Sequence, residues 1–167
     1  MKKLKTALIG LGNPIVGDDG IGIKVVEYIK DTFSLPENIE IIADVSLAGI
    51  GLVELFRGFD EIILVDSIQT NKFPKGTVVY LQPKNFANAL HISDYHSMDF
   101  YTDLEHCNQM YEDIPKDIKI LGIEIHNAME FSDHLSLELQ KKFEEIVDKV
   151  YKFILQENNE RMKVKVL

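Results

Sequence analysis

The sequence predicts a single α/β domain in which helices cover both faces of a mostly parallel, five-stranded sheet. Apolar runs of strand length alternate along the chain with segments whose apolar residues recur every three to four positions. The run at 61–66, EIILVD, holds four consecutive apolar residues, which is typical of a strand buried on both faces. The length of 167 residues and the 46% hydrophobic content suit one domain, which we expect to span residues 1–167.

The first half of the chain predicts three strands and two helices. Residues 4–9 form a short apolar run, and apolar positions four apart make 20–31 a helix. The segment NIEIIA makes 38–43 the second strand. Residues 48–56 are expected to form a short helix, although two glycines weaken it. The third strand, 61–66, is expected to lie at the centre of the sheet.

The second half predicts two further strands and two further helices. A Pro–Gly turn leads into a strand at 76–83, and apolar alternation begins another at 117–125. A weaker helix covers 97–110. The segment 137–155 is the clearest helix, because six apolar residues fall on one face and Ser136 can cap its start.

Composition and charge restrict the location and the partners. The 27 acidic residues outnumber the 18 Lys and Arg, giving a net charge of −9, and no basic cluster precedes residue 160, so nucleic acid is not expected as a partner. No apolar stretch approaches the ~20 residues that span a bilayer, so no membrane association is expected. The first apolar run leads into a glycine loop, so it is expected to be a strand and not a signal peptide. Cys107 is the single cysteine, which excludes an internal disulfide and favours the cytoplasm. The tail at 157–167 is expected to fray or to pair with another segment.

Acidic residues follow three of the predicted strands. The loop at 10–19 leaves the first strand and contains Asp18 and Asp19, Asp44 follows the second strand, and Asp66 ends the third. Sites in parallel sheets lie beyond the carboxyl ends of the strands. If the first and third strands are neighbours, Asp66 and the Asp18–Asp19 pair share one rim of the sheet.

The glycine loop lacks the features of a phosphate-binding loop. In GLGNPIVGDDGIG the third glycine of a dinucleotide fingerprint is replaced by Ile15, and a Walker Gly-Lys-Ser/Thr is absent. Two acids at a helix start would also repel a pyrophosphate. GLGNP resembles the opening of bacterial peptidyl-tRNA hydrolases, which continue with a glycine and an Arg-His-Asn segment that this chain lacks; that reading stays an alternative.

Carboxylates at a rim suit a cation, and one histidine would complete a mixed oxygen–nitrogen site for a transition metal. The spacing of the histidines does not choose among them. The chain has no His-Glu-x-x-His and no Gly-x-Ser-x-Gly, and Cys107 lacks the local context of a nucleophile. The five candidates are His91, His96, His106, His126 and His134.

Several motifs together resemble the hydrogenase maturation endopeptidases. GLGNPIVGDDGIGIKVV is similar to the family's opening signature, and IIADVSLAGIGLVELF, DEIILVDSI, YHSMDFYTDL and ILGIEIHNAMEFSDHLSLELQKKF follow in the family's order. The similarity covers about residues 4–155. It implies a three-layer, phosphorylase/hydrolase-like fold. The chain departs from the family at 45–47, Val-Ser-Leu, where many members have a Gly-Gly-Thr turn, so the choice of substrate is left open.

The resemblance implies an endopeptidase that removes a C-terminal extension from the nickel-loaded precursor of a nickel–iron hydrogenase large subunit. The family's metal-contacting and catalytic positions correspond to Asp19, Asp66 and His96, and nothing independent selects His96 over His91. The nickel is expected to arrive with the precursor, and water is the expected attacking group. Asp18 is expected to cap the helix or brace the loop. A non-catalytic nickel-sensing assembly protein on the same fold is the other alternative; the oligomeric state is open.

Overall fold

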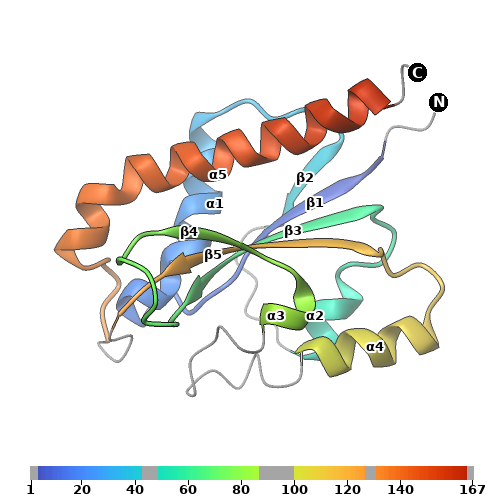
Figure 1. Cartoon of the computed structure of the whole chain (residues 1–167), viewed down its shortest axis with the longest axis horizontal. Helices are drawn as coiled ribbons and strands as arrows, with labels where there is room; N and C mark the ends of the chain where they lie inside the picture. The colour runs from blue at the N-terminus through green and yellow to red at the C-terminus, as the bar shows by residue number, and fades with distance from the viewer. Residues whose placement is uncertain (1–3, 43–48, 87–99, 127–130, 165–167) are drawn as a thin grey trace.

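The computed structural model describes residues 4–42, 49–86, 100–126 and 131–164, and its centre is a five-stranded sheet (Figure 1). The strand order is β2-β1-β3-β5-β4. All neighbouring strands are parallel except β4, which runs antiparallel to β5 at one edge. The strands are β1 Thr6–Gly10, β2 Ile39–Ile42, β3 Glu61–Ile68, β4 Val78–Leu81 and β5 Asp117–Glu124.

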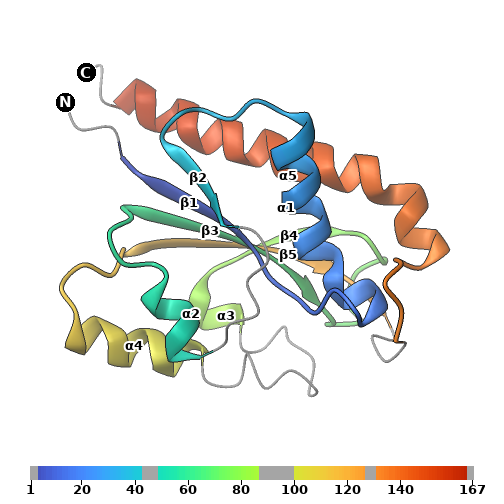
Figure 2. The same ribbon diagram turned by 180° about the vertical axis from the view of Figure 1, so that it is seen from behind.

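Helices cover both faces of this sheet, as the sequence predicts (Figures 1 and 2). One face carries α1 and α5, and the other carries α2 and α4 with the short α3 beside them. The helices are the 3-10 turn η1 Gly17–Gly20, α1 Ile21–Thr32, α2 Ile50–Glu54, α3 Pro83–Phe86, α4 Phe100–Met110 and α5 Leu137–Val164. None of the helices in the described ranges is both long and apolar enough to cross a membrane.

Strand β3 shows how the two faces divide the core. Its alternate residues Ile62 and Leu64 pack with α2 and α4, whereas Ile63 and Val65 pack with α1 and α5. All four side chains are buried, which is why this strand is apolar at successive positions. The alternation places Asp66 on the α2–α4 face and Ser67 on the α1–α5 face.

Several elements differ from the expectation. The strand expected at 76–83 is confined to Val78–Leu81, and the short helix Pro83–Phe86 that follows it was not expected. Strand β3 continues past Asp66 to Ile68, because β5 pairs with it as far as Ile68 and Glu124. Helix α2 is shorter than the expected 48–56. It begins after Gly49, whose positive φ of 59° is not helical, and it ends at Glu54. Helix α5 continues to Val164, so the tail is helical to that residue. Side chains at 157 and 158 of this extension bind Lys119 and Asn38.

Candidate functional site

The loop between β1 and α1 folds back tightly on itself. Gly12 has a φ of 132°, and a Cβ at this position would lie 2.1 Å from the carbonyl oxygen of Asp19. Only glycine allows this conformation together with so close an approach. The loop then turns through η1, which holds both Asp18 and Asp19, and delivers them to the carboxyl end of the sheet.

Asp19 is buried, and its carboxylate links the loop to β3. Its Oδ2 accepts a hydrogen bond of 2.9 Å from the backbone N–H of Asn13. Its Oδ1 accepts one of 2.7 Å from the hydroxyl of Ser67. Hydrogen bonds to a charged acceptor are stronger than those between neutral groups. Asp19 is therefore held in one orientation, next to the residue that follows Asp66.

Asp66 lies at the same rim, because the first and third strands are neighbours, the condition for the shared rim predicted from the sequence. Strands β1 and β3 pair in parallel, and the Leu11 N–H beyond β1 donates to the Val65 carbonyl at 2.8 Å. The half-buried Asp66 accepts a hydrogen bond of 2.8 Å at Oδ1 from the backbone N–H of Ser67. Adjacent positions of β3 therefore concern two carboxylates. Asp66 is part of the strand, and Asp19 is bonded to the next residue, Ser67.

Asp18 has different partners from its neighbour. Its Oδ1 accepts a hydrogen bond of 2.7 Å from the backbone N–H of Ser136, and its Oδ2 pairs with Lys75 Nζ at 2.5 Å. These contacts agree with the expected bracing role, since Asp18 joins η1 to the start of α5 and to the β3–β4 connection. The expected cap from the Ser136 hydroxyl is wrong, because that hydroxyl makes no hydrogen bond within the described residues.

The predicted histidine ligand His96 lies outside the described residues, as do His91 and Asp44. The described histidines have other surroundings. His126 Nε2 lies 3.2 Å from the Phe73 carbonyl oxygen, and His134 Nε2 lies 3.3 Å from a carboxylate of Asp133. Within the four described ranges, no three His, Cys, Asp or Glu side chains are arranged to hold a metal ion. The site of Asp19, Asp66 and His96 therefore stays a prediction, to which the described part contributes two carboxylates.

Cys107 is buried on α4, and burial raises the pKa of its thiol. A buried thiol kept in its neutral form is a poor nucleophile. This agrees with the expectation that Cys107 does not attack the substrate.

The sequence did not indicate three side chains that organise this rim. Ser67 orients Asp19, and Lys75 neutralises Asp18. The fully buried Glu124 accepts hydrogen bonds from the Thr70 N–H, the Thr70 hydroxyl and the Asn71 N–H, which fixes the β3–β4 connection. Each partner is distant in sequence, 48 residues for Ser67 and Asp19, so no local pattern could have shown the pairing.

Comparisons with known proteins agree on one family. A family model described as hydrogenase maturation protease matches residues 23–157. The hydrogenase 2 maturation protease of Escherichia coli is 26% identical over 124 residues, which cover 72% of this chain and 73% of the relative. A putative hydrogenase maturation protease of Methanocaldococcus jannaschii is 37% identical over 79 residues, covering 47% and 50%.

Solved structures confirm the α/β fold. The hydrogenase maturating endopeptidase HybD from Escherichia coli superposes with a TM-score of 0.76 at 21% identity, covering 92% of this chain and 94% of that one. The maturation protease HybD from Thermococcus kodakarensis has a TM-score of 0.69 at 19% identity, covering 90% and 99%.

Proposed function

Because this chain belongs to the hydrogenase maturation protease family, we propose that it removes a C-terminal extension from the nickel-loaded precursor of a nickel–iron hydrogenase large subunit in the cytoplasm. The family membership supports proteolysis during hydrogenase maturation and decides against the peptidyl-tRNA hydrolase alternative. The observation that carries the finer proposal is the oriented, buried carboxylate of Asp19, bonded to Ser67 directly after Asp66, at the rim where parallel sheets hold their sites.

The donor set suits a metal ion that the substrate carries. Each oxygen of Asp19 accepts one hydrogen bond from the described residues, and a carboxylate offers about four lone-pair directions in all. Directions therefore remain for an ion or a water molecule. Two carboxylates with the imidazole of His96 would form a modest site for a free ion, because thiolates are absent from the set. We therefore propose that nickel arrives already bound to the precursor and completes its coordination here.

In this proposal, water attacks the scissile carbonyl. Nickel held by the precursor supplies Lewis-acid polarisation. The carboxylates of Asp19 and Asp66 orient the precursor at the rim. One of them accepts the proton of the attacking water and returns it to the leaving amine as the C–N bond breaks. The buried Cys107 takes no part.

The test uses purified precursor in nickel-loaded and nickel-free forms, with intact mass as the readout. We expect loss of a C-terminal peptide from the nickel-loaded form alone, and Asp19→Asn should slow it by about 10²-fold or more. Asp31→Asn, an exposed carboxylate on α1, is the matched control and should cut at the wild-type rate. His96→Ala and His91→Ala, compared side by side, test which histidine belongs to the site.

Three outcomes would contradict the proposal. Cleavage of both precursor forms at equal rates would show that nickel is not needed for recognition. Wild-type cleavage by Asp19→Asn would remove the proposed site. Binding of the loaded precursor without any shortening would favour the non-catalytic assembly protein.

A further inference from the structure

We propose that an apolar ridge and the pocket beside it dock a segment of the precursor polypeptide in which an apolar side chain neighbours a carboxylate. The name ridge covers three exposed apolar residues, Ile15, Phe131 and Leu137. Ile15 lies in the loop that carries Asp19, Phe131 precedes the β-bridge to that loop, and Leu137 begins α5 shortly after it. The proposal rests on the proposed function for the identity of the partner. It adds a binding surface outside the three predicted metal-contacting residues. The lining residues of the pocket are Lys24, Asp133, His134, Leu135, Gln140 and Phe143.

The three side chains of the ridge are highly exposed for large apolar residues. Phe131 is 87% exposed, Leu137 74% and Ile15 60%, and the first two are the most exposed large apolar side chains among the described residues. Single exposed apolar residues are common on protein surfaces, but neighbouring ones mark interaction sites. Here three such residues come from two segments that the fold brings together.

Backbone hydrogen bonds fix the ridge in place. The Ser132 N–H donates to the Ile15 carbonyl at 3.0 Å, and the Gly17 N–H donates to the Ser132 carbonyl at 2.7 Å. Val16 and Ser132 therefore form a parallel β-bridge, which sets Ile15 and Phe131 beside each other. The ridge is part of the folded framework, so little conformational entropy is lost when a partner covers it.

The ridge is continuous with the candidate site. Gly17 begins η1, which contains Asp19, and the Ser136 N–H next to Leu137 binds Asp18. A polypeptide whose scissile bond lies at Asp19 must leave the rim across one of its borders. The border formed by residues 131–137, which is bonded to Asp18 through the Ser136 N–H, offers Phe131 and Leu137 as apolar contacts at this edge of the candidate site.

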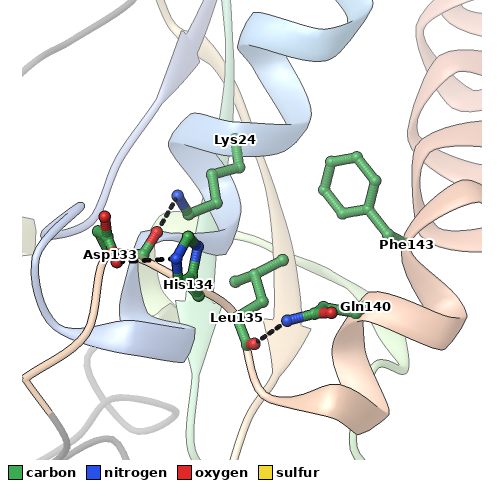
Figure 3. Close-up of a pocket in the computed structure, with 6 residues that line it drawn as sticks. All are labelled: Lys24, Asp133, His134, Leu135, Gln140 and Phe143. Atoms are coloured by element: carbon green, nitrogen blue, oxygen red, sulfur yellow. Dashed lines mark hydrogen bonds and ion pairs between the residues drawn. The ribbon is translucent and has the colours of Figure 1, made fainter.

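The pocket lies between α1 and the start of α5 (Figure 3), and its lining residues Asp133, His134 and Leu135 lie between Phe131 and Leu137 in the sequence. Its volume is about 350 Å³. In Figure 3, the Phe143 ring and the stem of Lys24 face one another across the hollow, with Leu135 below. This lining provides apolar contact for one large side chain of the partner.

The ammonium group of Lys24 at the pocket favours a carboxylate next to the apolar side chain of the bound segment. Lys24 Nζ donates to the Asp133 backbone carbonyl at 2.8 Å, and no ion pair joins Lys24 to a carboxylate of the described residues. The carboxylate of Asp133 is instead paired with His134 at 3.3 Å. Two of the three donors of Lys24 remain for a partner, and a carboxylate is the acceptor that an ammonium group binds most strongly. On a chain with a net charge of −9, this ammonium group is a local point of attraction for an acidic residue.

The experiment measures the Kd of the nickel-loaded precursor and the kcat and KM of its cleavage, using the full-length chain. Phe131→Ser and Ile15→Ser should each raise Kd and KM by about tenfold while kcat stays within about twofold, because they remove contact that is equal in ground and transition states. Lys24→Glu should raise Kd by a similar factor, and added salt should reduce the difference. The matched controls are Met110→Ser, 65% exposed on the opposite face, and Lys30→Glu, exposed on α1; both should bind as the wild type does.

The outcomes separate this inference from the proposed function. Unchanged Kd and KM in Phe131→Ser, Ile15→Ser and Lys24→Glu would overturn the docking surface even if the wild type cuts the precursor. Equal weakening by Met110→Ser would overturn it as well. Wild-type binding that the three variants weaken, without any cleavage, would support the surface and contradict the protease. A change in self-association of the variants, seen by sedimentation without a change in Kd, would assign the ridge to a second copy of this chain and overturn the proposal.

Discussion

Lys75 Nζ lies 2.5 Å from Asp18 Oδ2, and the two side chains are 11% and 6% exposed. The other oxygen of Asp18 is occupied by the Ser136 N–H. Asp18 therefore connects η1, the β3–β4 connection and the start of α5. Asp19, one residue later, connects the loop to β3 instead. Two adjacent carboxylates thus serve separate functions, one bracing the loop and one oriented at the rim.

Asp18→Asn should lower the free energy of unfolding by about 3–5 kcal/mol, because it leaves Lys75, whose side chain is only 11% exposed, without its counter-charge. Urea unfolding measures the change. Lys75→Met in the Asp18→Asn background should restore part of the loss, which a double-mutant cycle would show. The control is Asp148→Asn, whose pair with Lys152 is exposed and should contribute less than about 1 kcal/mol. Equal losses in the two Asp→Asn variants would contradict the bracing role.

Ser67→Ala should lower the free energy of unfolding by about 1.5–3 kcal/mol, the range for a hydrogen bond to a charged group. The same substitution in an Asp19→Asn background should have a smaller effect, because its charged partner has been removed. Urea unfolding of the four proteins gives the coupling energy. Strict additivity would show that the hydroxyl does not act on Asp19.

Gly22→Ala should destabilise the protein, although the helix propensity of alanine is more favourable than that of glycine by about 1 kcal/mol. A Cβ at Gly22 would lie 2.3 Å from the Val65 carbonyl oxygen and 2.5 Å from that of Leu11, and both are backbone atoms that cannot turn away. Helix α1 must then move off the ends of β1 and β3, at a cost of about 1–3 kcal/mol. Thermal unfolding detects this as a lower Tm. Glu27→Ala, at an exposed position of α1, should leave Tm nearly unchanged; a rise in Tm for Gly22→Ala would refute the close packing.

Lys119→Met should lower the free energy of unfolding by about 3–5 kcal/mol, because the buried Glu61 would lose its ion pair with Lys119. Burial opposes the charge of Lys119, but hydrogen bonds to Glu157 and Glu61 outweigh it and raise its pKa. The folded pKa therefore exceeds the unfolded value of about 10.4, and the stabilisation is complete below that pH and is lost as the pH rises through the folded pKa.

Urea unfolding between pH 8 and pH 11 would check this dependence. Lys119→Met should show a flatter alkaline decline than the wild type, whereas Lys149→Met, which removes an exposed i,i+4 pair, should follow the wild type. An identical decline in wild type and Lys119→Met would contradict the assignment to Lys119.

The sequence predicted the fold well because its evidence is local. A strand such as β3 shows its burial through successive apolar residues, and α1 and α5 show one apolar face each. Element ends were less well predicted, because they depend on pairing partners. The Asp117–Glu124 strand carries β3 past Asp66 to Ile68.

The site was predictable only in part for a related reason. Sites in parallel sheets lie beyond the carboxyl ends of the strands, so a rim shared by Asp66 and the Asp18–Asp19 loop could be expected once the first and third strands were neighbours, which only the structure shows. The partners of those acids could not, since Ser67 and Lys75 have no distinctive spacing from them in the sequence. Polar contacts between residues 48 or 118 positions apart are decided by the assembled tertiary structure.

The hydrogen bond between Asp18 and Ser136 also has a consequence for the order of synthesis. A chain made from its N-terminus presents the GDDG turn early, but the residue that clamps this turn lies 118 positions later. The β-bridge from Val16 to Ser132 must wait equally long. Domains fold as units during translation, so the rim that holds Asp19 is completed only after residues 132–136 have emerged. A nascent chain therefore carries both acids long before it has the framework that orients them.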